Sequence, residues 1–114
     1  MPIRTTIEKS VFASAARTST AVSSTLSMQE YIEGNLQIDI TANSGTDETL
    51  QCAVQIQDDD SSSSWKYLAV GKRHYATGTE VIQLSNFGKQ MRVQALIGGT
   101  SPSFTFKVDF IGKT

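Results

Sequence analysis

From Gly34 onward, apolar and polar residues alternate with a period of two through much of the chain. Successive side chains of a strand point to opposite faces, so this period is typical of strands with one buried and one solvated face. The clearest alternations predict four strands, at residues 36–40, 50–56, 91–97 and 104–110. Shorter patterns predict further strands at 65–70 and 79–84, and a weaker one at 21–28.

The number and spacing of these segments indicate the fold class. Seven or eight short strands, separated by turn signals roughly every 8 to 12 residues, predict an all-β antiparallel β-sandwich of jelly-roll or Ig-like type. A chain of 114 residues has the size of one domain. We expect that domain to cover residues 18–114, after an N-terminal arm at residues 1–17. Cys52 lies in an apolar alternation, which indicates a core position rather than a reactive thiol.

Two stretches of the sequence echo one another. GTDETLQCAV at residues 45–54 and GTSPSFTFKV at residues 99–108 share Gly-Thr, then Leu or Phe after three residues, then Val after three more. Each follows an alternating segment, so both are expected to be hairpins that turn at a Gly-Thr corner. Similar turn geometry explains the echo more simply than a duplication does.

The first third of the chain has a different composition, because half of residues 10–27 are Ser or Thr. Two interpretations stay open: an edge strand with a loosely held terminus, or an arm that becomes ordered on a neighbouring subunit. If the segment is an arm, a chain without residues 1–17 should still fold. The candidate interface residues of such an arm are Ile3, Arg4, Ile7, Val11 and Phe12.

The charge balance indicates the kind of partner. Ten Lys and Arg stand against eleven Asp and Glu, with no long run of either sign, which argues against binding to nucleic acid or to an anionic membrane. Protein partners are therefore expected. The sequence has no apolar run of about 18 residues and no signal-peptide core at its start. We expect a protein that is made in the cytoplasm and leaves it only within an assembly.

The acidic segment DDDSSSS at residues 58–64 is the first candidate for chemistry, but no register of it supplies the Gly and Glu of an EF-hand calcium loop. It is expected to be a solvated turn. His74 is the single histidine, and no Gly-x-Ser-x-Gly elbow accompanies it. We therefore expect no enzyme, no metal and no cofactor. Trp65, Tyr67 and Tyr75 could bind a glycan, although packing in the core or at its rim is the simpler role for Trp65.

A family resemblance rests on the order of several motifs: LQIDITANSGTDETLQCAVQIQDDDSSSSWKYL, then ATGTEVIQL, then MRVQALIGGTSPSFTFKVDF. This order resembles a group of small β-sandwich proteins encoded in the structural-gene clusters of tailed bacteriophages. The resemblance covers about residues 34–111 and consists of turn and core signatures. The acidic turn is longer here than the short Asp-Gly turn usual in that group, and residues 1–33 fall outside the resemblance.

The resemblance implies a component of the virion. The expected role is a capsid cement or decoration protein that binds the major capsid protein, or other virion proteins, and bridges capsomers. A neck, tail or baseplate subunit is the alternative within the virion, and a carbohydrate-binding β-sandwich module is the alternative outside it. Self-association is expected as well, with a trimer favoured because capsid lattices offer three-fold positions.

Overall fold

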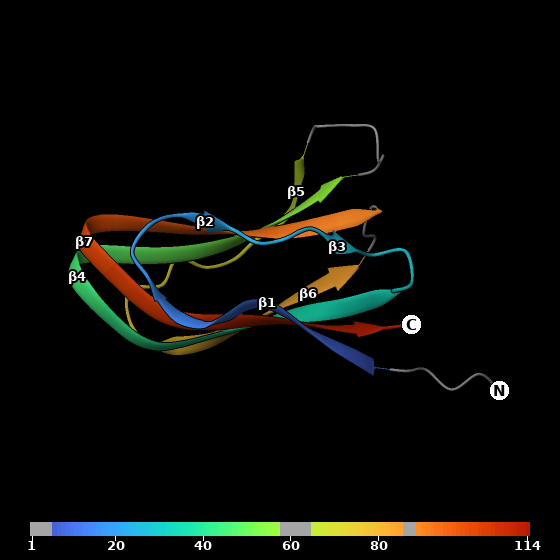
Figure 1. Ribbon diagram of the computed structural model, residues 1–114, viewed down its shortest axis with the longest axis horizontal. Coiled ribbons are helices and arrows are strands. Elements are labelled where there is room, and N and C mark those ends of the chain that lie inside the picture. The colour runs from blue at the N-terminus through green and yellow to red at the C-terminus, as the bar shows by residue number, and fades with distance from the viewer. Residues whose placement is uncertain (1–5, 58–64, 86–88) are drawn as a thin grey trace.

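The computed structural model describes residues 6–57, 65–85 and 89–114, and strands account for most of them (Figure 1). The strands are β1 (Thr6–Arg17), β2 (Ala21–Val22), β3 (Leu26–Ser27), β4 (Glu33–Gln57), β5 (Lys66–Val70), β6 (Gly78–Ser85) and β7 (Gln90–Lys113). Every pairing between them is antiparallel. The predicted all-β antiparallel fold is confirmed.

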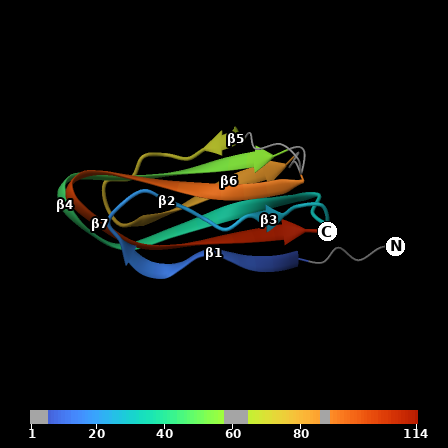
Figure 2. The same ribbon diagram turned by 45° about the horizontal axis from the view of Figure 1, so that its top comes forward.

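Two long strands organise the molecule. The four strands predicted most clearly from sequence lie in β4 and β7, two in each, and β4 and β7 pair along almost their whole length, from Glu33↔Lys113 to Gln57↔Gln90. This two-stranded ribbon bends back on itself, and its two halves form opposite layers (Figure 2). The remaining strands extend each half of the ribbon sideways.

The bend lies at the two Gly-Thr stretches. Thr46 pairs with Thr100, and the β4–β7 register shifts on both sides of that pair. Gly45 and Asp47 on one strand, and Gly99 and Ser101 on the other, have positive φ angles of 124°, 53°, 114° and 49°. The expectation of two hairpins was wrong, because each strand turns a corner between layers while staying paired with the other. The echo in sequence therefore reflects the same backbone conformation on both strands.

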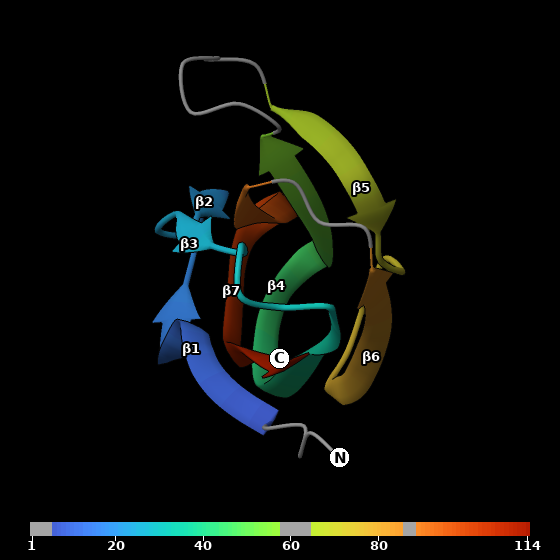
Figure 3. The same ribbon diagram turned by 90° about the vertical axis from the view of Figure 1, so that its right-hand side faces the viewer.

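The two layers have the strand order of a jelly roll. We call one the β1 layer; it contains β1, the end of β7, the start of β4, and β6. The other, the β5 layer, contains β2 with β3, the start of β7, the end of β4, and β5. In both layers, strands from the two halves of the chain alternate, as in a jelly roll. Figure 3 shows the layers end-on, with β5 and β6 on one side and β1, β2 and β3 on the other.

The core lies between the layers and follows the predicted alternation. Phe104, Phe106, Val108 and Phe110 on β7 are all fully buried, while Lys107 between them is exposed. The residues that β4 contributes to this core are Leu36, Ile38, Ile40, Leu50, Cys52 and Val54. Two T-shaped ring contacts join the row on β7 to other segments. The ring centroids of Phe12 and Phe106 lie 5.7 Å apart, and those of Tyr31 and Phe110 lie 5.2 Å apart. The period of two thus correctly identified the buried face.

The segment that could have been an arm is an edge strand of its own chain. β1 pairs with β7 from Thr6↔Lys113 to Arg17↔Phe104. Phe12 is 6% exposed and contacts Phe106, so it belongs to the core of its own chain. Ile7 and Val11 pack against the same core. β1 therefore belongs to the same sandwich as the strands after residue 17, whereas Ile3 and Arg4 lie outside the described residues.

The weak strand expected at residues 21–28 is two short strands instead. Ala21 and Val22 pair with Ala95 and Gln94, and Leu26 and Ser27 pair further along β7. Between them, Ser23 exchanges hydrogen bonds with Val93, whose N–H donates to the Ser23 hydroxyl at 2.8 Å. The segment therefore does not bury one continuous face: Met28 is buried, but Val22 is 48% exposed.

A candidate docking face

The outer surface of the β5 layer carries few charges. Pairing with β4 and β7 places alternate residues on this surface, and amide, aromatic and aliphatic side chains fill most of the positions. We call it the amide–aromatic face. Its residues are Val22, Gln51, Ala53, Gln55, Gln57, Trp65, Tyr67, Val70, Gln90, Arg92, Gln94 and Leu96.

An arginine and a tryptophan form the first bridge across this face. The guanidinium carbon of Arg92, on β7, lies 4.3 Å from the ring centroid of Trp65, next to β5. Arg92 also donates a hydrogen bond from Nε to Oε1 of Gln55 at 2.8 Å. Gln55 belongs to β4, which runs between the other two, so three neighbouring strands hold this cluster. A guanidinium stacked on an indole and hydrogen-bonded in its plane has little rotational freedom.

A second bridge runs beside the first. The Tyr67 hydroxyl of β5 donates to Oε1 of Gln94 on β7 at 3.2 Å, again across β4. The β4 residues of this face are themselves buried, because Ala53 and Gln55 are 0% and 8% exposed although they lie on an outer surface. Tyr67 itself remains 58% exposed. The face therefore presents a fixed aromatic side chain to solvent.

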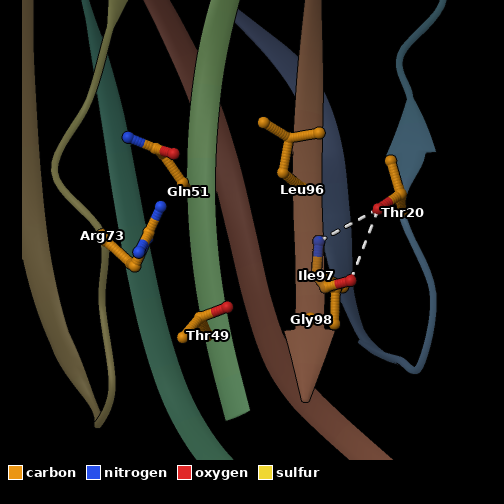
Figure 4. Close-up of a pocket in the computed structure, with 7 residues that line it drawn as sticks. All are labelled: Thr20, Thr49, Gln51, Arg73, Leu96, Ile97 and Gly98. Atoms are coloured by element: carbon orange, nitrogen blue, oxygen red, sulfur yellow. Dashed lines mark hydrogen bonds between the residues drawn. The ribbon is translucent and has the colours of Figure 1, made fainter.

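A shallow hollow of about 260 Å³ lies at the end of the face nearest the corner (Figure 4). Gln51 and Arg73 lie on one side of β4, and Leu96 lies on β7. The Gln51 amide donates to the carbonyl of Gly71 at 2.9 Å, and the Ile97 N–H donates to the hydroxyl of Thr20 at 3.1 Å. The remaining lining residues are Thr49 and Gly98. This hollow has the size and polarity to receive one side chain of a partner.

The other outer surface differs in charge. On the β1 layer, the outward positions carry charged residues of both signs. Lys107 Nζ lies 3.9 Å from an oxygen of Asp109, and Lys113 Nζ lies 3.7 Å from an oxygen of Glu33. The outward charged residues are Glu8, Glu33, Asp39, Lys107, Asp109 and Lys113. Charged pairs of this kind are typical of a solvated surface.

The single histidine, His74, contacts Glu80 of β6. His74 Nε2 lies 2.7 Å from Oε1 of Glu80, and Oε2 of Glu80 accepts the backbone N–H of Lys72 at 2.9 Å. His74 also exchanges two backbone hydrogen bonds with Leu50. These contacts attach the connection between β5 and β6 to β4 in one layer and to β6 in the other. The described residues contain no group of three His, Cys, Asp or Glu side chains that could hold a metal ion.

Cys52 has the environment of an inert thiol. It is 2% exposed, and burial, with a smaller contribution from the charge of Glu80, raises its pKa to about 12. A thiol with this pKa stays protonated at neutral pH and is a poor nucleophile. The core position predicted for Cys52 is confirmed.

The aromatic residues proposed for a glycan site do not gather at one place. Trp65 and Tyr67 share the amide–aromatic face, whereas Tyr75 follows His74, which pairs with Leu50. Tyr67 pairs with Gln55. Five residues of strand separate these two pairings, so His74, which precedes Tyr75 in the chain, lies about 17 Å along the sheet from Tyr67. The acidic segment DDDSSSS at residues 58–64, the first candidate for chemistry, lies outside the described residues.

Sequence reasoning missed the amide–aromatic face as a unit. Its two bridges join β5 to β7, which are far apart in sequence and are not neighbours in the sheet. A signal was present, because Gln51, Gln55 and Gln57 alternate along one strand and Gln90 and Gln94 along another. Uncharged amides at successive outward positions indicate a surface that avoids charge.

Comparison with known proteins gives no family for this chain: no family model matches it, and no curated protein matches it. Among the described residues, the structure contains no helix with the length and apolar character needed to cross a membrane.

Proposed function

We propose that this chain is a non-enzymatic structural protein of a tailed-phage virion, and specifically a capsid cement or decoration protein that bridges capsomers. Its partner is then the major capsid protein, and its location is the virion. The observation that carries the proposal is the amide–aromatic face, with Tyr67 and Trp65 held by Gln94 and Arg92. The resemblance of residues 34–111 to phage β-sandwich proteins supplies the biological setting.

The composition of the face supports a protein partner. Tyr, Trp and Arg are enriched among the residues that contribute most to protein–protein binding, and charged residues are depleted at the centres of such interfaces. Tyr67, Val22 and Val70 are about half exposed, so apolar area remains to be buried. Because the bridges already restrict Tyr67 and Arg92, binding would cost little side-chain entropy. Repetition over a shell lattice would add avidity.

The proposal is tested by quantitative mass spectrometry of purified particles. The expected result is a copy number that matches a class of positions on the shell lattice. A few copies per particle would instead assign the chain to the neck, tail or baseplate, and absence from the particle would contradict a virion role. Rebinding to particles stripped of this chain adds a second readout: Tyr67→Lys should abolish rebinding, whereas Lys107→Glu on the opposite face should rebind normally.

A carbohydrate-binding module is the second candidate, and the exposure of Tyr67 beside the amides of Gln55 and Gln94 favours it. Aromatic rings and amide side chains are common in sugar-binding sites. Against it, the guanidinium of Arg92 covers one face of the Trp65 ring. A glycan array separates the two candidates. Specific binding that Tyr67→Ala abolishes would support the carbohydrate-binding module, and an array without binding would contradict it.

A further inference from the structure

The two edges of the β1 layer differ in how they are protected. β1 forms one edge and has two register shifts, between Ser10 and Phe12 and between Phe12 and Ala15. Arg17 donates hydrogen bonds to the carbonyls of Ala13 and Ala15, at 2.9 and 3.3 Å. Bulges and side chains that occupy edge carbonyls both prevent the addition of another strand. The second half of the β1 edge is thus protected against strand pairing.

β6 forms the opposite edge and lacks these features. It pairs with β4 in unbroken register from Gly78 to Ser85, and its other side borders no strand among the described residues (Figure 3). Its sequence, GTEVIQLS, contains no Pro, Lys or Arg. Val81, at its centre, is 55% exposed. By comparison, β5 is short and carries a register shift, and β2 and β3 have two residues each.

The one acidic side chain of β6 finds its contacts within the chain. Glu80 points between the layers, where one oxygen contacts His74 and the other accepts the N–H of Lys72. Its side chain is 11% exposed. The outward positions of β6 are Thr79, Val81, Gln83 and Ser85, which are all uncharged and exposed.

We propose that the β6 edge is a self-association site at which a second copy of this chain adds its own β6 in antiparallel orientation. A two-fold axis through Val81 places Val81 opposite Val81 of the second copy and Thr79 opposite Gln83. Outward side chains then meet outward side chains, and no like charges face one another. The same pairing joins two β1 layers into one continuous sheet.

This arrangement is isologous, so it produces a closed pair of copies. The trimer expected earlier was inferred from the symmetry of capsid lattices, whereas the edge chemistry favours two-fold contact. The β6 edge also lies away from the amide–aromatic face, which is on the other layer. The pair would therefore leave both copies of that face accessible, and the inference does not depend on the identity of the partner that binds there.

Sedimentation velocity over a concentration series tests the pairing. The intact chain should sediment as a dimer, and Val81→Lys should weaken the dimer at least about tenfold, because two ammonium groups would face one another across the axis. Val70→Lys is the matched control, since Val70 is 56% exposed but lies on the other layer; it should leave the dimer unchanged. A monomer, a trimer, or a dimer insensitive to Val81→Lys would overturn the proposal.

Cysteine cross-linking tests the register. Val81→Cys should give a disulfide-linked dimer under mild oxidation, because residues directly opposite in an antiparallel pair are close enough to bridge. Thr79→Cys alone should not, because its two copies would lie about 13 Å apart; Thr79→Cys combined with Gln83→Cys should. Cys52 is 2% exposed and does not compete. Equal cross-linking of both single variants, or of neither, would contradict the register.

Reactivity of the thiol at position 81 gives a further outcome. If the Val81→Cys chain is a monomer and its thiol is protected from modification only on particles, the β6 edge binds another protein and the self-association proposal is wrong.

Discussion

The aromatic residues of the β1 layer face the core, whereas those of the β5 layer lie on its outer surface. In the β1 layer, Phe12, Phe104, Phe106 and Phe110 point into the core, and the outer surface carries charged residues. In the β5 layer, the core side holds aliphatic residues and Cys52, while Trp65 and Tyr67 lie on the outside. One layer therefore buries its aromatic side chains, whereas the other carries two of them on its outer surface.

If the amide–aromatic face is the docking face that we propose, this difference separates stability from recognition. A buried phenyl ring contributes to folding through the apolar area that it removes from water. Tyr67 is 58% exposed, so most of its area contributes nothing to folding. The hydrogen bond to Gln94 nevertheless fixes its position. Substitutions on the core-facing side of the β1 layer should thus alter stability. Substitutions on the outer surface of the β5 layer should alter binding alone.

Deleting residues 1–17 should have the largest effect on stability. The deletion removes Phe12 and Arg17 and leaves the Phe106 ring and one edge of β7 uncovered. The loss should exceed the roughly 3 to 5 kcal/mol of one buried phenylalanine, enough to unfold a marginal domain. Circular dichroism and thermal melting of this variant and of a chain that lacks residues 1–5 provide the measurement. Native-like melting of the longer deletion would show that β1 is dispensable.

Phe106→Ala should come next, because it empties a fully buried position on the inner side of the β1 layer. We expect a cost of about 3 to 5 kcal/mol, measured by chemical denaturation. Lys107→Ala, one residue away on the exposed side, should change the unfolding free energy by less than about 0.5 kcal/mol. Similar costs for the two variants would contradict the assignment of inner and outer faces.

Gly99→Ala tests the corner that both layers share. Gly99 has a φ of 114°, and an added Cβ would lie 2.8 Å from the backbone of Asp47 and Glu48. Both effects are unfavourable, with an expected cost of about 1 to 3 kcal/mol in the unfolding free energy. Gly98→Ala is the control, because its added Cβ would meet only the Thr49 hydroxyl, at 3.1 Å. An equal loss in both would show that the positive φ at residue 99 is unimportant.

Replacing Asp58, Asp59 and Asp60 together with Asn should have the smallest effect. If these residues form the solvated turn expected from the sequence, their charges contribute less than about 1 kcal/mol, and melting and particle binding should both be nearly unchanged. Melting curves with calcium and with chelator provide the check. A calcium-dependent Tm that the substitution abolishes would reveal a metal site in this turn.

The sequence predicted the strands well where alternation is regular. The residues from Phe104 to Phe110 alternate without interruption, and their burial follows. β1 was harder to recognise, because two bulges break its period and Ser and Ala fill many of its positions. The corners at Gly45 and Gly99 were recognised as turns, but a turn signal cannot tell whether two distant strands bend together.

The candidate face could not be predicted as a unit. The Arg92–Trp65 contact and the Tyr67–Gln94 hydrogen bond depend on the strand order β5, β4, β7. Local patterns determine which side of its strand a residue occupies, but they do not determine which strands become neighbours. Tyr75 shows the same limitation, since closeness in sequence to Trp65 and Tyr67 suggested a shared site that the register of the sheet separates.

The most direct test of the account is a footprint of the particle-bound protein. The free and the particle-bound chain would be treated in parallel with a tyrosine-modifying and a lysine-acylating reagent, and modification at each residue would be measured by mass spectrometry. We predict that binding protects Tyr67 strongly and leaves Lys107 on the opposite face reactive, because the amide–aromatic face is the surface that we propose contacts the shell. Protection of Lys107 with Tyr67 still reactive would contradict it.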